Sequence, residues 1–451
     1  MVTAADSEQQ KEITEESPLL TVFRKEAHET MLNRINLASA FKLSPQELRV
    51  EIENFVFDFA QERRSQITKR EQIVIARELV DDMIGLGPLE SLLEDDGISD
   101  IVVNGPTQIY MEKKGIMQLA AARFRDDSHL LQIAQRIAHR VGRRVDTSSP
   151  LCDARLPDGS RVNIVVPPIA LDGVSISIRK FSKKAINLHG LAANGSLTEE
   201  MVRVLQIAST CGLNIIVSGG TGSGKTTLLN ALSQLIDPRE RIVTCEDAAE
   251  LKLQQPHVVR LESRPPNIEG KGEITIRDLV KNALRMRPDR IVIGEVRGVE
   301  CIDMLQAMNT GHDGSMSTVH ANKAREAFIR LENMVAMSGF DLPSEIVRAQ
   351  IAGAVNLIVQ TERLHDGSRK ITEIVEVTGL TERGEIGFHH LFKFVPLGED
   401  SEHRVFGRFD AGTDKPAFLE KAIIFGLDKE LLEVMKKAKG TTVGGDDDYY
   451  F

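Results

Sequence analysis

Residues 219 to 226 read Gly-Gly-Thr-Gly-Ser-Gly-Lys-Thr, a complete G-x-x-x-x-G-K-[ST] pattern. An apolar run ending at Val217 precedes this stretch, and Leu228, Leu229 and Leu232 follow it at helical spacing. The order strand, glycine-rich loop, helix is typical of phosphate binding, because glycine lets backbone amides converge on phosphate oxygens. The stretch therefore predicts an α/β domain that binds a nucleoside triphosphate. An ordinary glycine-rich turn is the less favoured alternative.

Each residue type in this loop has a chemical reason to be there. Lys225 brings a positive charge to the β- and γ-phosphates, and the Thr226 hydroxyl can bind Mg²⁺. Mg²⁺ is therefore an expected cofactor. The candidate nucleotide-binding residues of the loop are Gly219, Gly220, Thr221, Gly222, Ser223, Gly224, Lys225, Thr226 and Thr227.

The composition favours a multidomain globular protein. The chain has 451 residues, which allows about three domains. No apolar run approaches the roughly 18 residues that cross a bilayer, and the acidic N-terminus lacks the basic start and apolar core of a signal peptide. The four cysteines stand singly, as is usual in a reducing compartment. We therefore expect a cytoplasmic protein, and the net charge of -10 disfavours a broad nucleic-acid-binding surface.

Changes of pattern divide the chain into segments. Capping boxes at Ser44 with Glu47 and at Thr68 with Glu71 predict two helices near the N-terminus. Short strands follow, and in 174–180 the apolar residues alternate with polar ones. In 197–436 strands and helices alternate, which predicts a mostly parallel sheet with helices on both faces. The predicted segments are 1–16 (disordered), 17–89 (helical bundle), 90–181 (α+β domain), 182–196 (linker), 197–436 (the domain with this sheet) and 437–451 (flexible tail).

Two acidic residues follow apolar strands downstream of the loop. Glu246 comes directly after the strand at 241–245, where ligands bind in open α/β sheets, so it could orient the attacking water. A helix cap is the alternative for Glu246. Glu295 follows the apolar strand at 290–294, in the position of a Walker B acid. It would bind Mg²⁺, largely through water molecules, or polarise the nucleophile. The usual Asp-Glu pair is Gly-Glu here.

Two histidines follow, His312 and His320, eight residues apart. Zinc is the alternative reading, but no cysteine or further histidine lies at ligand spacing. A neutral imidazole near the γ-phosphate fits better. Asn322 and Lys323 begin a guanine-reading pattern in which Arg325 replaces the required Asp, so adenine is the expected base and ATP the expected nucleotide.

These motifs together resemble the secretion ATPase superfamily of type II secretion, type IV secretion and type IV pili. The motifs are the loop, the acidic box at Glu246, the Gly-Glu strand with Arg297, and the paired histidines. The stretches 153–163, 177–181, 296–300 and 304–312 resemble, more narrowly, the Tad/Flp pilus assembly ATPases of the CpaF type. The resemblance covers about 90 to 395, and the helical block at 17–87 is also typical of that branch.

The resemblance implies a homohexameric ring at the cytoplasmic face of the inner membrane. Each nucleotide would lie between a small PAS-like α+β domain and a RecA-like P-loop domain, with Arg161 and Arg179 of the former approaching the phosphates as arginine fingers. A surface ion pair is the alternative for either arginine. The implied partners are inner-membrane pilus platform proteins and indirectly pilin. Membrane association would be peripheral, through those partners, with no nucleic acid involved.

The predicted function is that of a motor that hydrolyses Mg-ATP to assemble a Tad/Flp pilus. Retraction of the same pilus by this motor is an open alternative. Glu246 is the favoured general base, although Glu295 could also reach the water. A type II or type IV secretion motor is the nearest alternative. A nucleic-acid translocase, a small-molecule kinase and a nucleotide-switch scaffold with negligible turnover remain as rivals from other classes.

Overall fold

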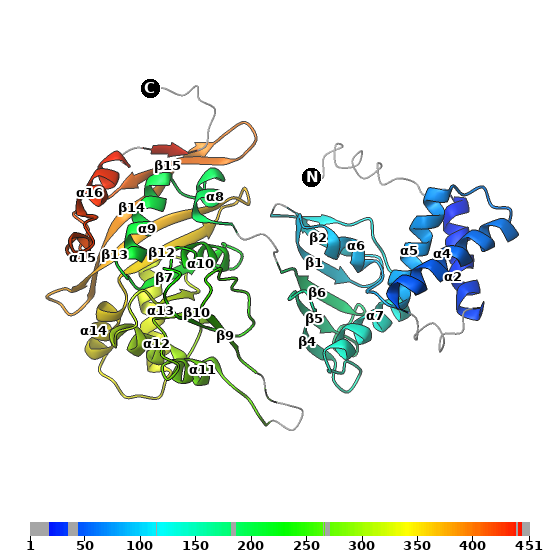
Figure 1. The fold of residues 1–451 in the computed structure, drawn as a ribbon, viewed down its shortest axis with the longest axis horizontal. Helices are drawn as coiled ribbons and strands as arrows, with labels where there is room; N and C mark the ends of the chain where they lie inside the picture. Colours follow the sequence, from blue (N-terminus) through cyan, green and yellow to red (C-terminus); the bar gives the residue numbers. More distant parts are fainter. Residues whose placement is uncertain are drawn as a thin grey trace. The chain divides into compact units, whose positions relative to one another are not determined.

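The computed structural model describes residues 18–34, 44–113, 115–181, 186–264, 266, 271–438 and 441–443. The predicted disordered segment 1–16 lies outside these residues. The chain forms two compact units, Met1–Lys183 and Lys184–Phe451, which are described one at a time (Figure 1).

The described part of the first unit begins with four helices, two of which have N-termini fixed by side-chain caps. Its helices are α2 (Pro18–Arg34), α4 (Pro45–Glu62), α5 (Lys69–Met83) and the short α6 (Leu89–Glu94). Both predicted capping boxes are present: the Ser44 amide donates to Glu47 Oε2 over 2.8 Å, and the Thr68 amide donates to Glu71 Oε2 over 2.6 Å. Apolar residues of α2, α4 and α5 form one core, in which the Phe23 and Phe59 rings lie 5.2 Å apart.

The rest of the first unit is an antiparallel sheet whose core is shared with α6 and with a further helix. Its elements are β1 (Ile98–Asn104), β2 (Ile109–Lys113), β3 (Ile116–Leu119), α7 (Asp127–Arg140), β4 (Leu151–Arg155), β5 (Arg161–Val165) and β6 (Ser175–Arg179). The strand order is β3-β2-β1-β6-β5-β4. The predicted alternation in β6 is confirmed: Ile176 and Ile178 are buried in the core with α7, whereas Ser177 and Arg179 are exposed.

The second unit is built on a single ten-stranded mixed sheet. Its elements are α8 (Leu188–Ala193), α9 (Glu199–Thr210), β7 (Ile215–Gly219), α10 (Lys225–Ser233), β8 (Ile242–Glu246), β9 (Val258–Glu262), α11 (Ile276–Ala283), β10 (Arg290–Val296), α12 (Glu300–Asn309), β11 (Met316–Val319), α13 (Ala324–Ala336), α14 (Ser344–Ala354), β12 (Leu357–Arg363), β13 (Arg369–Leu380), β14 (Ile386–Glu399), β15 (Val405–Ala411), α15 (Leu419–Ile424), α16 (Asp428–Lys437) and β16 (Thr441–Val443). The order is β16-β15-β14-β13-β12-β7-β11-β10-β8-β9.

Helices cover both faces of this sheet, as the strand and helix alternation predicts (Figure 1). Ile215 and Val217 of β7 face a core shared with α9 and α10, while Ile216 between them faces a core shared with α12 and α13. Because β7 is buried on both faces, its residues 215–217 are all apolar.

The structure corrects three expectations about residues 182–451. The sheet is parallel only from β12 to β9, because β13 to β16 add antiparallel strands beyond β12. Residues 188–193 of the predicted linker form α8, whose Leu188 is buried in the core of the second unit. Within the predicted flexible tail, β16 pairs with β15. Among the helices described, none is long and apolar enough to span a membrane.

Candidate active site

The glycine-rich loop joins β7 to α10, as predicted. Gly222 and Gly224 have φ values of +71° and +97°, in the left-handed region that favours glycine. At Gly219 the reason is space, since a Cβ there would lie 2.4 Å from the Thr361 carbonyl oxygen. Glycines therefore give this loop a backbone shape that other residues would not hold.

Lys225 is the first residue of α10, so its backbone amide belongs to the helix N-terminus. Its Nζ donates to the carbonyl oxygens of Gly219 and Gly220 over 3.0 and 2.8 Å, which folds the side chain back over the loop. Thr226 follows it in the first turn of the helix. The positive end of a helix and an ammonium group thus meet in the loop, an arrangement that favours an anion.

Glu246 is the last residue of β8 and its side chain is buried, with 2% of the residue exposed. Its Oε2 accepts hydrogen bonds from the amides of Glu250 and Leu251 over 2.7 and 2.8 Å. Its Oε1 is buried with no hydrogen-bond partner among the residues that the structure describes. Burial raises the pKa of Glu246, against the opposing effect of the two amides. One oxygen fixes the turn, and the other keeps an unused acceptor position.

Gly294 stands where the usual Walker B strand carries an aspartate. It lies on β10, which runs parallel to β8, and a Cβ at this position would lie 3.0 Å from Glu246 Cγ. Its carbonyl accepts a hydrogen bond from Thr318 Oγ1 over 2.8 Å. The glycine therefore makes room for the buried glutamate of the neighbouring strand.

Glu295 is held by an ion pair beside this glycine. Arg297 Nη2 donates to Glu295 Oε2 over 2.6 Å, and Arg297 Nη1 lies 3.7 Å from Asp247 Oδ2. The hydrogen bond to Glu295 raises the pKa of Arg297. The arginine thus connects the two acidic motifs that the sequence placed at the ends of neighbouring strands.

His320 follows β11, which lies between β7 and β10 in the sheet. Burial and the positive charge of Lys225 lower the pKa of His320, whereas the carboxylate of Glu295 raises it. With the pKa below its ordinary value of 6.5, the imidazole is neutral at pH 7. Lys225 and Glu295 therefore both act electrostatically on His320, at the same edge of the sheet.

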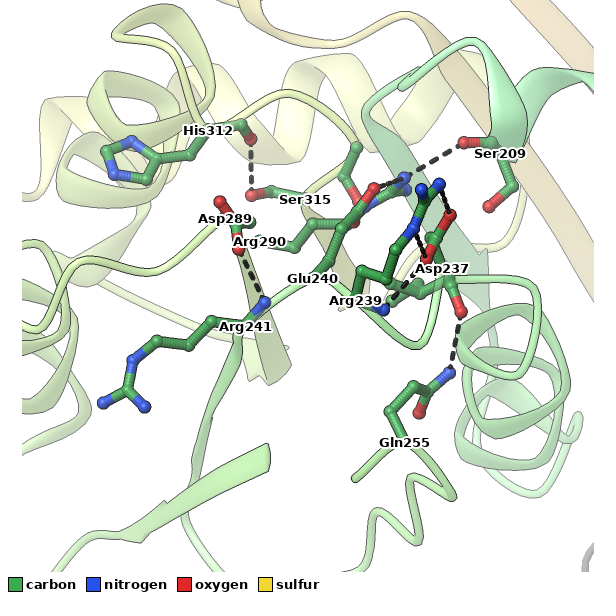
Figure 2. Close-up of polar contacts among 12 residues, drawn as sticks. Ser209, Asp237, Arg239, Glu240, Arg241, Gln255, Asp289, Arg290, His312 and Ser315 are labelled. Carbon is green, nitrogen blue, oxygen red and sulfur yellow. Dashed lines mark hydrogen bonds and ion pairs between the residues drawn. The ribbon is translucent and has the colours of Figure 1, made fainter. Parts of the chain in front are cut away.

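His312 does not share that edge, which corrects the expectation that both histidines lie near the phosphates. It precedes β11, whereas His320 follows it. Figure 2 shows its carbonyl accepting from Ser315 Oγ, over 2.7 Å, at the end of the sheet where the buried Arg290 pairs with Glu240. His312 Nδ1 lies 3.2 Å from the Ala307 carbonyl oxygen, a contact that joins it to α12. Strand β11 separates the two imidazoles, so we do not assign His312 to the nucleotide.

Arg161 and Arg179 lie in the first unit and are direct cross-strand partners on β5 and β6. Arg155 on β4 is in turn the partner of Arg161, so three arginines form a row across neighbouring strands. Arg179 is exposed and donates to Asp100 Oδ1 over 3.2 Å. The sequence predicted the polar face of β6 but not this alignment with β4, which comes from strand register.

Two arginines that no motif in the sequence indicates border the loop. Arg369 Nε donates to the Gly222 carbonyl oxygen over 2.9 Å. A Cβ on Gly222 would lie 3.6 Å from Arg363 Nη1. Both arginines lie far from the loop in sequence, and only the pairing of β12 with β7 brings them to it.

The described residues contain no group of three or more His, Cys, Asp and Glu side chains that could hold a metal ion by themselves. Mg²⁺ does not need such a group, because it keeps several waters and binds one or two protein oxygens together with substrate phosphates. The Thr226 hydroxyl and the Glu295 carboxylate supply oxygens of that kind. The residues present fit a nucleotide-bound Mg²⁺.

Comparisons with known proteins agree on one family. The family model described as type II/IV secretion system protein matches residues 82–384. A Mycobacterium tuberculosis protein named "Putative conjugal transfer protein" is 41% identical over 304 residues, which are 66% of this chain and 86% of that relative. The type IV secretion system protein VirB11 of Bartonella quintana is 32% identical over 326 residues, 64% of this chain and 91% of the relative. The crystal structure of the VirB11 ATPase from Brucella suis in complex with sulphate is 32% identical and covers 64% of this chain and 94% of that one, with a TM-score of 0.35.

Proposed function

The chain belongs to the type II/IV secretion system protein family, and from this we propose that it is a motor ATPase that hydrolyses Mg-ATP. The observation that carries the proposal is the arrangement at one edge of the second sheet. There the glycine-rich loop with Lys225, the buried Glu246, and the mutually interacting Glu295 and His320 come from four neighbouring strands. Ligands bind at such carboxyl ends of parallel strands.

In this proposal the loop holds the triphosphate. Backbone amides from Gly220 to Thr226 and the Lys225 ammonium bind the phosphate oxygens. Thr226 and Glu295 would hold Mg²⁺, the latter largely through water, and the ion would supply neutralisation of the phosphate charge. Thr221 and Thr227, which are exposed at the two ends of the loop, border the nucleotide.

Glu246 is the proposed general base. Its Oε1 takes a proton from the water that attacks the γ-phosphorus, while the bond from that phosphorus to the ADP oxygen breaks. The raised pKa of Glu246 makes it a stronger base than an exposed carboxylate, and its fixed Oε2 keeps the reacting oxygen in place. Neutral His320 donates its ring N–H to an oxygen of the γ-phosphate and so reports its presence.

Arg161 and Arg179 are the proposed arginine fingers. They are permanently charged donors, suited to a phosphate whose charge shifts in the transition state, and such groups can contribute roughly 10³ to 10⁵ in rate. Their cross-strand pairing presents both guanidinium groups from one place on the first unit.

The machine that we propose for this motor is a Tad/Flp pilus, supported by the resemblance of stretches 153–163 and 296–300 to that branch. The protein would act as a homohexamer at the cytoplasmic face of the inner membrane, on platform proteins that add pilin. A type IV secretion or conjugal transfer motor is a second candidate, which the names of the relatives in Mycobacterium and Bartonella favour.

Two measurements test these proposals in turn. Steady-state phosphate release by the purified chain, compared with Lys225→Ala, tests the ATPase activity; equal rates would contradict it. Many-fold stimulation of that activity by DNA would favour a translocase instead.

In cells, Lys225→Ala should abolish surface pili with ordinary growth, whereas loss of plasmid transfer with pili intact would favour the second candidate.

A further inference from the structure

The phosphate loop rests on β12, a strand that no nucleotide motif of the sequence includes. Thr361 is the register partner of Gly219, the first residue of the loop. Its Oγ1 donates to the Ser223 carbonyl oxygen over 2.9 Å, so its side chain points toward the loop. Side chains two apart on a strand share a face, so Arg363 is directed to the same side. Strand β12 therefore presents a guanidinium group next to the loop.

The neighbouring strand presents a second guanidinium group. Arg369, the first residue of β13, is the antiparallel register partner of Arg363, and such partners lie on one face of a sheet. Its Nε donates to the Gly222 carbonyl oxygen over 2.9 Å. A Cβ on Gly224 would lie 3.3 Å from Arg369 Cδ, so this side chain lies along the outside of the loop.

The turn between these strands is held in place. Asp366 Oδ1 accepts from the Ser368 amide over 2.9 Å, and its Oδ2 accepts from the Val405 amide of β15 over 2.8 Å. The hairpin is thus hydrogen-bonded to β15, three strands away from β12 in the sheet. A binding group needs such support to hold a precise position.

We propose that Arg363 and Arg369 form a clamp on the α- and β-phosphates of the nucleotide, Arg363 by contact and Arg369 by positioning Gly222. The proposal rests on the ATPase function proposed above. In loops of this type the backbone amides cradle the α/β-phosphates, and Arg363 Nη1 approaches the loop at Gly222. The arginine fork matches phosphate oxygens and remains charged at all working pH values.

The test compares Arg363→Gln and Arg369→Gln with their lysine counterparts and with Arg408→Gln as a matched control. Arg408 is an exposed arginine of β15 that pairs with Asp410 over 2.9 Å, in the same sheet but with no part in the loop. The dissociation constants of Mg-ATP and Mg-ADP are measured by titration, together with kcat and KM. Unfolding temperatures without nucleotide show whether each variant is folded.

We expect each glutamine variant to bind ATP and ADP about tenfold more weakly, with KM raised to match and kcat near parental. Arg363→Gln loses one charged hydrogen bond to the nucleotide, whereas Arg369→Gln loses the bond that positions Gly222. Arg363→Lys should recover part of the affinity, because it keeps the charge and loses only the fork. Arg408→Gln should behave as the parent does. A loss for ATP with ADP unchanged would contradict the placement at the α- and β-phosphates.

The controls separate this proposal from the one on which it rests. If the parent hydrolyses ATP and the Arg363 and Arg369 variants bind both nucleotides normally, the clamp is wrong and the ATPase assignment stands. If the parent neither binds nor hydrolyses ATP, the proposed function itself fails.

Discussion

Glu246 and Gly294 occupy neighbouring parallel strands in such close contact that a Cβ on the glycine would lie 3.0 Å from Glu246 Cγ. The placement of the Glu246 side chain thus depends on the absence of a side chain on the next strand. This accounts for the Gly-Glu sequence at 294–295, which departs from the usual acidic pair. An aspartate at 294 would occupy the space that the buried Glu246 needs.

Gly294→Ala should displace Glu246 and slow ATP hydrolysis, with destabilisation of about 1–3 kcal/mol from overpacking. Phosphate release and chemical denaturation measure the two effects. In the background of Glu246→Ala, which removes the opposing side chain, the same substitution should cost much less stability. Equal costs in both backgrounds would show that the two residues do not compete for space.

The pH dependence of hydrolysis should report on Glu246. Because burial raises its pKa above the ordinary value of 4.5, and because a base must be deprotonated to act, kcat/KM should fall with decreasing pH along a limb centred above 4.5. Glu246→Gln should bind ATP normally and hydrolyse it about 10² to 10⁴ times more slowly, without that limb. A near-parental rate in Glu246→Gln would transfer the role to Glu295.

The same pKa shift affects stability. A carboxyl whose pKa is raised in the folded state contributes stability below its unfolded pKa, and this contribution is lost as the pH rises through the folded value. Glu246→Gln removes that dependence, so its free energy of unfolding should improve relative to the parent between pH 4 and pH 7. Denaturant titrations at both pH values measure the difference; a constant difference would argue against the raised pKa.

The two histidines should behave differently. His320→Ala should slow hydrolysis, by about a hundredfold if its hydrogen bond acts in the transition state, because His320 interacts with Lys225 and Glu295. His312→Ala should leave the rate near parental, since β11 separates this residue from the loop. Comparable losses in single-turnover rate from both variants would restore the histidine pair that the sequence suggested.

The arginine fingers can be tested against an ordinary surface arginine. Arg161→Gln and Arg179→Gln should lower kcat by about 10³ while nucleotide affinity changes little. Arg144, whose side chain is 79% exposed and pairs with Asp146, provides the control. If Arg179→Gln matches Arg144→Gln in turnover, its bond to Asp100 is the surface ion pair of the alternative interpretation.

Local patterns in the sequence predicted the elements well where one physical signal dominates. The capping boxes at Ser44 and Thr68 fixed two helix starts, and the alternation in β6 gave its buried face. Because ligands bind at the carboxyl ends of parallel strands, the sequence alone predicted that Glu246 and Glu295 lie near the loop. These signals depend on neighbours in the chain or on the general geometry of parallel sheets.

What the sequence could not predict depends on register and on which end of a strand a residue occupies. His312 and His320 look equivalent in a list of motifs, but four residues of β11 lie between the two loops that carry them. Arg363 and Arg369 border the glycine-rich loop because segments more than a hundred residues apart pair in the sheet. The hydrogen bond from Arg369 to Gly222 illustrates this separation. The row from Arg155 to Arg179 likewise depends on strand alignment.

The antiparallel extension of the second sheet sets a limit on how this protein can be dissected. The family match ends at residue 384, just before β14, yet Phe392, Phe394 and Phe409 of β14 and β15 belong to the same core as Ile215 and Val217 of β7. A fragment trimmed at that boundary would leave β13 as an unpaired edge above an open apolar surface, a template for aggregation. Domain exchanges between relatives should therefore carry the chain through Val443.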